Sequence, residues 1–562
     1  MSRRFALAAL AALAAPWPAA GQQMSDLVPA PPGAAREVAP PENAAPVPLR
    51  PTAAGESPTI VLRGVALGGA TVVPEADLAP LWADLIGTPV DLVTLEALAE
   101  RIGAAYRARG FVLSQAFLPA QVVEDGIIRV DVIEGFVDRV AVTGGAPEQT
   151  AAVGRRFAPV TGERPMRLQT VERGVLLSRD LLGGGVETVL EPSPDTFGAA
   201  DMTVLLDPPP PVGFAAADNR GSRLYGEGTF VLGGVAHNLL GANERLELLA
   251  AGSPGGALTY VRGLAAFPIG RLDGTLLDGT MLEFEADYAE GDPDLTVAGS
   301  TPGLSVATRE SNVRVGLRTP FIRTRTQNLF GHVLLDWQDA TNVTSFGPDA
   351  ISEEDRLLVF EMGAEWDRAD RFGGVTLASG QLRQGIDAGN TFVGSETSAG
   401  VADFTLVTGR VARLQRLGEG PNGLWFEAIG QYAGDVLPNS ERFALGDATI
   451  GRGFAPGNTT GDSGFGARVE LRRTLGPETL GRFGEAAELY GYADYGRAFD
   501  RDASRDGDEW EELGSIGVGL RWDVTSSLTL TPEIARQFAG RPSDTREDGR
   551  ETRVYISAVM RF

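Results

Sequence analysis

The sequence predicts a mainly β protein: a transmembrane β-barrel of about sixteen strands, preceded by two small α/β domains with the order β-α-α-β-β. Three observations carry this prediction. The chain begins with an export signal, residues 57–209 run twice through the same order of elements, and residues 210–562 alternate apolar and polar side chains without helical periodicity. With 562 residues, the chain is also too long for one small core.

The N-terminus has the three parts of a signal peptide, predicted over residues 1–21. Arg3 and Arg4 supply the positive charge, the apolar run Phe5–Ala15 follows, and small side chains at 19–21 suit cleavage. The run is too short to cross a bilayer, and no later stretch approaches the roughly 18 consecutive apolar residues that a membrane helix needs. We therefore expect an exported chain that enters a membrane only as a closed barrel.

A tether rich in Pro and Ala, residues 22–56, leads into two similar α/β domains at 57–135 and 136–209. Pro at this density prevents a stable helix and favours an extended chain. The best helix of the first domain is Thr94–Arg109, with Thr94 as its expected cap, and Leu168–Leu182 is a helix of the second domain. A repeated unit of this kind is a binding module more often than a catalytic one. The remaining predicted elements are strands Ile60–Val65, Phe111–Leu118, Ile127–Ile133, Val137–Thr143, Val186–Glu191 and Ala200–Leu206, with helices near Pro74 and over Gln149–Phe157.

The barrel prediction rests on alternation that persists from residue 212 to Phe562. Apolar side chains alternate with carboxylates in Leu282–Tyr288, for example, and with Arg and Glu in Phe465–Arg472. A soluble antiparallel sheet would also alternate, but the persistence of this pattern without helices indicates an apolar outer face and a polar lumen. The predicted strands are 212–220, 226–236, 243–251, 257–267, 279–288, 312–320, 328–336, 357–366, 373–382, 403–414, 423–433, 465–473, 486–496, 513–522, 527–536 and 552–562.

The last strand alternates up to the final residue, Phe562. A terminal aromatic that closes an alternating strand resembles the signal read by the outer-membrane assembly machinery. We therefore predict that Phe562 is a C-terminal assembly signal, and that the barrel meets both this machinery and outer-membrane lipid.

A long connection, about residues 434–464, separates two of the predicted strands, and its length indicates a functional role. It contains Arg452, Gly453 and Phe454, and the next strand but one carries Asp494. A guanidinium is planar and permanently charged, so it can form a bidentate pair with a carboxylate and hold a loop inside a lumen. Gly453 would let the tip turn sharply. The alternative is that Arg452 lies on a surface loop and Asp494 is one more acid of the lumen.

Composition and charge exclude several classes of function. The net charge of −25 opposes nucleic-acid binding, which needs a basic face. The chain has no Cys, hence no disulfide, thiolate nucleophile or Cys-based metal site. His237 and His332 are the only histidines, which argues against a His-dependent triad or a zinc centre. We predict no catalytic residue, no metal, no cofactor and no nucleic-acid partner, and therefore no enzyme.

Five segments in this order resemble the outer-membrane transporters of two-partner (type V) secretion, the haemolysin and filamentous-adhesin exporters, which are relatives of the barrel-assembly insertases. The segments are Tyr106–Phe111, Ile133–Gly135, Asp218–Gly221, Arg452–Phe454 and the surroundings of Asp494. The resemblance covers nearly everything after the tether. It implies two polypeptide-transport-associated (POTRA) domains, a sixteen-stranded barrel, and a long loop that folds back into the lumen.

The resemblance also implies roles for particular residues. Arg452 would form the loop tip with Gly453 and Phe454, and it would pair with Asp494 of the inner wall. The supporting positions are Gly461, Asp462, Gly464 and Gly496. Two departures stand out: Gly451 replaces the usual aliphatic residue and is expected to loosen the tip, and residues 22–56 are too rich in Pro for the plug helix that relatives often carry.

The implied function is export of an unfolded secreted partner, a haemolysin or an adhesin, through the outer membrane of a Gram-negative bacterium. The POTRA domains would bind the partner in the periplasm, and neither cofactor nor nucleotide would be needed. Three alternatives stay open: an insertase that assembles other barrels, a diffusion porin and an outer-membrane hydrolase. A porin has no use for the α/β domains, and a hydrolase lacks a recognisable nucleophile setting.

Overall fold

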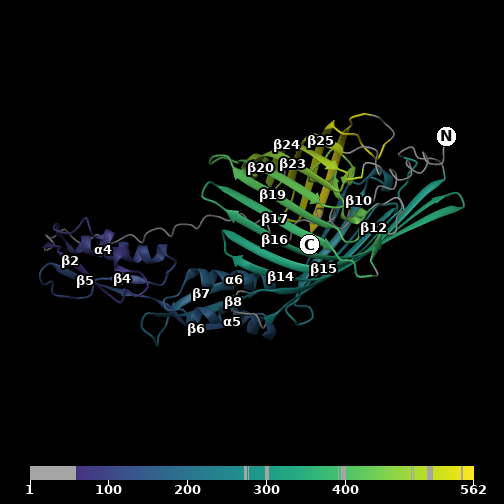
Figure 1. The fold of residues 1–562 in the computed structure, drawn as a ribbon. Helices are drawn as coiled ribbons and strands as arrows, with labels where there is room; N and C mark the ends of the chain where they lie inside the picture. Colours follow the sequence, from purple (N-terminus) through teal and green to yellow (C-terminus); the bar gives the residue numbers. More distant parts are fainter. Residues whose placement is uncertain are drawn as a thin grey trace.

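The computed structural model describes residues 59–545 and 549–562, except 271–274, 276, 298–302, 390, 394–399, 482–483, 485 and 503–509. The signal peptide and tether predicted for residues 1–56 lie outside the described residues. Two small α/β units stand at one end of a closed β-barrel (Figure 1). The predicted fold class, a mainly β chain with a sixteen-stranded barrel, is confirmed.

The first unit has a three-stranded sheet of order β2-β5-β4, in which β2 runs parallel to β5 and β4 antiparallel to it. Its elements are β1 (Ile60–Val61), β2 (Gly64–Gly68), α3 (Glu75–Leu78), β3 (Pro89–Val90), α4 (Leu92–Ala108), β4 (Gln115–Phe117) and β5 (Ile127–Ile133). Helix α4 buries Leu95, Leu98, Ile102 and Tyr106, the face that helical spacing predicts.

Three details of the first unit differ from the sequence prediction, and the first is that the predicted strand Phe111–Leu118 is confined to β4, Gln115–Phe117. The cap of α4 is Asp91, whose carboxylate accepts hydrogen bonds from the main-chain nitrogen (2.9 Å) and the hydroxyl (2.6 Å) of Thr94. The predicted cap, Thr94, therefore lies inside the helix, because a carboxylate three residues earlier satisfies the free amide. The predicted strand Ile60–Val65 is two strands, since β1 pairs with β3 and only β2 joins the main sheet.

The second unit repeats this arrangement with sheet order β6-β8-β7. As in the first unit, the central strand of the sheet has one parallel and one antiparallel neighbour: β6 runs parallel to β8, and β7 runs antiparallel to β8. Its elements are β6 (Phe136–Gly144), α5 (Pro147–Gly162), α6 (Leu168–Leu182), β7 (Val186–Pro192) and β8 (Ala199–Leu206). The two units thus share element order and strand order, as the repeated sequence pattern suggests.

The second unit is fixed to one rim of the barrel by polar contacts from its helices. Arg323 of the barrel donates to both carboxylate oxygens of Asp180, at 2.8 and 2.7 Å. Arg173 of α6 donates to the carbonyl oxygens of Asp278 (3.2 Å), which precedes β13, and of Pro320 (3.0 Å), near the end of β14. This rim therefore faces the α/β units, and the opposite rim is remote from them.

Each barrel strand pairs antiparallel with its neighbours, and β27 pairs with β9 to close the ring. The strands are β9 (Val212–Asp218), β10 (Thr229–His237), β11 (Arg245–Gly252), β12 (Leu258–Pro268), β13 (Met281–Gly291), β14 (Leu304–Arg323), β15 (Gln327–Phe346), β16 (Asp349–Ala369), β17 (Gly374–Gly385), the two-residue β18 (Phe392–Val393), β19 (Thr405–Arg416), β20 (Asn422–Ala433), β23 (Ser463–Leu475), β24 (Ala486–Phe499), β25 (Trp510–Asp523), β26 (Leu528–Ala539) and β27 (Thr552–Arg561).

Strands β14, β15 and β16 are far longer than the sequence predicts. They have 20, 20 and 21 residues, whereas about 9–11 residues cross a bilayer. Their extra length lies at the rim remote from the α/β units, where Figure 1 shows the β15–β16 hairpin projecting. Alternation reveals only the part in contact with lipid, because a polar extension in water needs no apolar face.

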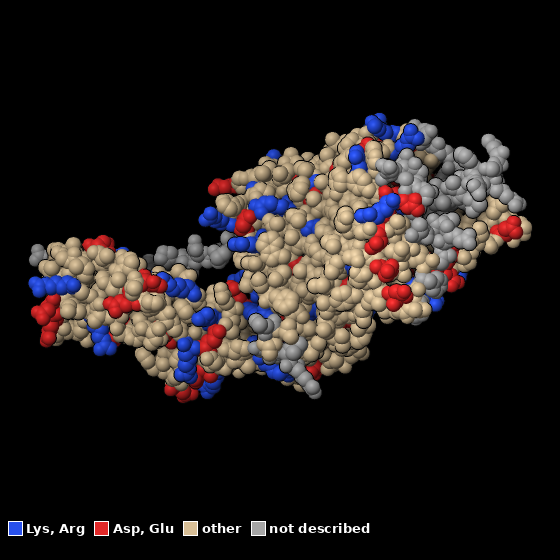
Figure 2. All heavy atoms as spheres, in the orientation of Figure 1, with Lys and Arg blue, Asp and Glu red and all other residues tan. Residues whose placement is uncertain are grey.

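The outer wall of the barrel is apolar, and its inner wall is polar. In β13, the side chains of Phe284 and Tyr288 are exposed outward, while Asp287 is buried on the other face. Figure 2 shows charged side chains gathered on the α/β units and toward the barrel ends, with a mostly uncharged band between. Among the described residues, no helix is long and apolar enough to cross a membrane.

Phe562 lies at the seam where the barrel closes. Its main-chain nitrogen donates to the carbonyl oxygen of Gly213 (2.9 Å) and its carbonyl accepts from the Gly213 nitrogen (2.8 Å). Its ring covers Gly213, whose missing side chain leaves the space, and remains 67% exposed on the outer face.

Candidate functional site

The connection between β20 and β23, residues 434–462 and here called the inward loop, starts at the remote rim and packs inside the lumen. It contains the short helix η4 (Asn439–Glu441) and a hairpin of β21 (Phe443–Leu445) and β22 (Thr459–Gly461). Its apolar side chains form a buried cluster with the wall residue Leu513. The members of the cluster from the loop are Phe443, Leu445, Ile450 and Phe454.

Arg452, at the tip of the inward loop, is 5% exposed and reaches the carboxylates of two wall strands. Its guanidinium pairs with Glu470 of β23 at 3.0 Å and with Glu533 of β26. It also donates to the hydroxyl of Tyr490 (3.2 Å) and lies 4.3 Å from the ring centroid of Tyr492. Two carboxylates and two aromatic rings therefore enclose one cation, which is the arrangement that stabilises a buried guanidinium.

Asp494 lies beside the tip, but not as the sequence predicts. Its carboxylate accepts from the main-chain nitrogen of Arg452 (3.2 Å) and from the nitrogen (3.0 Å) and hydroxyl (2.8 Å) of Ser515. The predicted ion pair between the Arg452 guanidinium and Asp494 is therefore wrong: Asp494 binds the main chain of Arg452, and the guanidinium pairs with Glu470 and Glu533. Because these short-range donors hold Asp494, the longer Arg452 side chain extends past it to Glu470 and Glu533.

The main chain of Gly453 is hydrogen-bonded to the wall through both its nitrogen and its carbonyl oxygen. Its nitrogen donates to the Ser515 hydroxyl (3.1 Å), and its carbonyl accepts from the Gln537 amide (2.7 Å). A β-carbon at Gly453 would stand 2.9 Å from that of Ser515. Gly451 has φ of +81°, which a side chain rarely tolerates. The departure at 451 thus allows a tight turn.

The supporting positions keep the inward loop close to the wall. Asp462 is fully buried and accepts from the main-chain nitrogens of Leu437 and Arg501, both at 2.8 Å. A β-carbon at Gly461 would stand 2.7 Å from main-chain atoms of Phe499, and one at Gly496 would stand 2.7 Å from the side chain of Leu445. At Gly464, it would collide with the ring of Phe443.

Sequence reasoning missed the residues that hold the tip from the wall. They are Glu470, Glu533, Tyr490, Ser515 and Gln537. Each stands at an inward position of an alternating strand, a signal shared by many lumen residues, so alternation alone selects none of them. Arg220, in a segment that the sequence did single out, reaches Glu533 at 3.0 Å.

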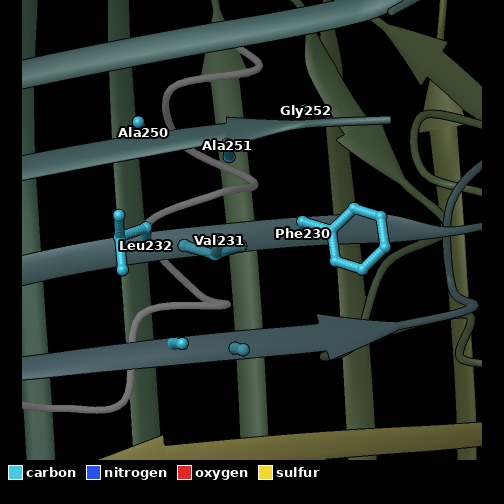
Figure 3. Close-up of a pocket in the computed structure, with 8 residues that line it drawn as sticks. Phe230, Val231, Leu232, Ala250, Ala251 and Gly252 are labelled. Carbon is cyan, nitrogen blue, oxygen red and sulfur yellow. The ribbon is translucent and has the colours of Figure 1, made fainter. Parts of the chain in front are cut away.

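The arrangement is suited to holding a loop inside the lumen. In the described part of the chain, no three His, Cys, Asp or Glu residues are grouped to hold a metal ion. A depression across β9, β10 and β11 is lined only by Gly, Ala, Val, Leu and Phe (Figure 3), so no polar side chain there would orient a substrate.

Comparison with known proteins gives two family matches. Residues 60–135 match the family described as "POTRA domain, ShlB-type", and residues 208–522 match "Haemolysin secretion/activation protein ShlB/FhaC/HecB". The heme/hemopexin transporter protein HuxB of Haemophilus influenzae is 22% identical over 499 residues, which are 86% of this chain and 84% of HuxB. The outer membrane transporter CdiB of Escherichia coli is 26% identical over 193 residues, covering 33% of this chain and 32% of that protein.

Solved structures share the fold. CdiB from Escherichia coli superposes with a TM-score of 0.68 at 18% identity, covering 96% of this chain and 95% of its own. CdiB from Acinetobacter baumannii gives 0.60 at 16% identity, covering 96% of each chain. BamA from Haemophilus ducreyi lacking POTRA domains 1–3 gives 0.52 at 14% identity, covering 90% of this chain and all of its own.

Proposed function

The chain belongs to the haemolysin secretion/activation protein family ShlB/FhaC/HecB, and on this premise we propose that it exports an unfolded secreted protein across the outer membrane through its barrel. The observation that carries the proposal is the inward loop. It occupies the lumen, yet it is held only by hydrogen bonds, ion pairs and packing. Such a loop can move aside and leave a polar passage.

The lumen suits an extended polypeptide in transit. A barrel of sixteen strands encloses an aqueous channel when nothing fills it. Its inner wall carries many paired Arg and acidic side chains, which would leave an unfolded chain little continuous apolar surface to bind. The two carboxylates that bind Arg452 would remain paired if the loop left. Glu533 also forms an ion pair with Arg220, and Glu470 forms ion pairs with Arg472 (2.7 Å) and Arg521 (2.8 Å).

The α/β units, two POTRA domains over 57–135 and 136–209, would receive the partner in the periplasm. Each sheet ends in an edge strand, β4 or β7, whose outer side pairs with no other strand of its sheet. An extended peptide can add to such an edge through main-chain hydrogen bonds. The partner would be an exoprotein of the haemolysin or adhesin type, and transport would use neither cofactor nor nucleotide.

Two further contacts belong to the proposal. The uncharged outer band would face outer-membrane lipid (Figure 2), and Phe562, exposed at the closing seam, would serve the assembly machinery during insertion. The insertase alternative is not favoured, because the likeness to BamA at 14% identity concerns the fold alone, whereas the family match covers most of the barrel, residues 208–522.

Surface release of the exoprotein encoded beside this chain tests the proposal. Cells with the intact protein, with a deletion, and with Arg452→Ala are compared. We expect deletion to abolish release and Arg452→Ala to lower it sharply, while the variant barrel still assembles and remains heat-modifiable. Undiminished release after deletion, with other barrels lost from the outer membrane, would replace export with the insertase function.

A further inference from the structure

The root of the inward loop has an anchor of its own, separate from the tip. Glu441, at the end of η4, is 7% exposed. Arg383 of β17 donates to both of its carboxylate oxygens, at 2.8 and 2.7 Å. Gln338 of β15 donates to one of them at 2.8 Å, and the hydroxyl of Ser440 donates back to the Gln338 amide oxygen at 3.0 Å. Bidentate, charge-assisted bonds of this kind are among the strong polar contacts.

The two anchors lie on opposite walls. The tip is held by β23–β26, whereas Glu441 and Ser440 are held by β15 and β17. Leaving out the two-residue β18, Gln338 on β15 and Glu533 on β26 are eight strands apart in either direction around the barrel. The inward loop therefore crosses the lumen from wall to wall, and freeing the tip alone would leave its root across the passage.

The wall site for Glu441 persists without the loop. Arg383 also binds Asp336 (3.1 Å) and Glu361, so departure of Glu441 leaves no unpaired buried cation. The leaving carboxylate would regain water in an opened lumen. Removal of a partner from a buried pair is costly when the remaining charge is stranded, and the neighbours of Arg383 prevent that outcome.

We propose that Glu441 is a second latch of the inward loop, a positioning residue docked on Arg383 and Gln338, and that export requires its release independently of the Arg452 tip. This inference rests on the proposed export function. It assigns to the root of the loop a role that the tip motif does not cover.

A reversible lock tests the latch directly. Because the chain has no cysteine, the pair S440C/Q338C is the only thiol pair in the variant protein. Ser440 contacts the far end of the Gln338 side chain, so a short thiol-reactive crosslinker with an internal disulfide can span the gap left by the shorter Cys side chain. Crosslinking should tie the root to the wall and lower exoprotein release at least tenfold, and a reductant that cleaves the crosslinker should restore release to the level before treatment. In each single variant, S440C or Q338C, release should be the same before and after crosslinker treatment.

Channel recording supplies a second, independent readout. Full-length E441Q in planar bilayers should show open events several-fold more often than wild type, because the neutral amide keeps the shape but loses the charge-assisted pair. E419Q, on an exposed turn of the rim facing the α/β units, is the matched control and should match wild type.

The outcomes separate the two proposals. Wild type that releases nothing overturns the export function. Wild type that releases normally, with a crosslinked double variant that releases as much as the untreated double variant or with E441Q channels like wild type, overturns the latch and leaves the export function standing.

Discussion

Asp494 binds the main-chain nitrogen of Arg452 and not its guanidinium. The Asp494 carboxylate positions the main chain of the loop tip, whereas the Arg452 guanidinium binds Glu470 and Glu533 of the wall. Residue 452 thus has two separable contacts: the main-chain bond survives every substitution except proline, and the guanidinium contacts do not. Substitutions at the two positions should therefore differ in their effects.

Arg452→Ala should free the tip while keeping the barrel assembled. It removes the pairs with Glu470 and Glu533, but these acids keep Arg472, Arg521 and Arg220. We expect a loss of stability below the roughly 3–5 kcal/mol typical of a stranded buried charge. The temperature at which the barrel unfolds on semi-native gels measures it. Arg473→Ala, at an exposed position of the same wall, is the control; equal shifts for both variants would contradict the assignment.

Ser515→Ala should loosen the tip although no charge changes. The hydroxyl of Ser515 accepts from the Gly453 nitrogen and donates to Asp494, so its loss leaves buried polar groups unsatisfied, at about 1–3 kcal/mol. We expect faster protease cleavage within the inward loop in intact outer membranes. Ser515→Thr retains the hydroxyl and should restore much of the protection; protection unchanged in Ser515→Ala would show that the tip does not depend on this bridge.

Gly464→Ala should prevent the inward loop from seating. A β-carbon there collides with the ring of Phe443 and stands 2.9 Å from the carbonyl oxygen of Arg497. Overpacking of this kind costs about 1–3 kcal/mol, and the loop yields more readily than the barrel wall. Gly263→Ala is a matched control, because a β-carbon at Gly263 meets nothing within 4 Å. Single-channel recording should show frequent openings for the first variant and wild-type behaviour for the second.

The link between the α/β units should weaken in acid through Glu134. Partial burial alone would raise the pKa of Glu134, but hydrogen bonds from Thr71, Val72 and Tyr106 outweigh it and hold the pKa below its usual 4.5. A depressed carboxyl pKa stabilises the fold above the unfolded value, and this contribution is lost as pH falls through the folded pKa.

Hydrogen exchange at the Thr71 and Val72 amides of the full chain measures this loss. Protection should fall as pH drops below about 4.5 in wild type, and it should be lower and nearly independent of pH in Glu134→Gln. A wild-type profile as flat as that of the variant would mean that the carboxylate does not hold this turn.

The sequence predicted those elements whose side chains must alternate between water and an apolar phase. Helix α4 and the lipid-facing parts of the strands follow from such periodicity. The outer parts of β14–β16 are rich in polar residues and carry no continuous apolar face, so alternation did not reveal them. Their length could not be read from the chain.

The sequence identified part of the site but not the contacts that hold it. The segment around Arg452 and the position of Asp494 were identified, and the structure brings them together. The partner carboxylates, Glu470 and Glu533, were not identified, because every inward acid of a polar lumen has the same sequence signature. Only the depth and direction at which the loop enters select among them, and both depend on packing between distant parts of the chain.

The length of β14–β16 has a consequence at the cell surface. At about 3.3 Å per residue and a tilt near 40°, a twenty-residue strand rises roughly 50 Å, twice the height of a barrel's apolar band. The excess extends past that band at the rim remote from the α/β units, so a raised β wall borders one side of the barrel mouth. A molecule that approaches the mouth from that side meets this wall first.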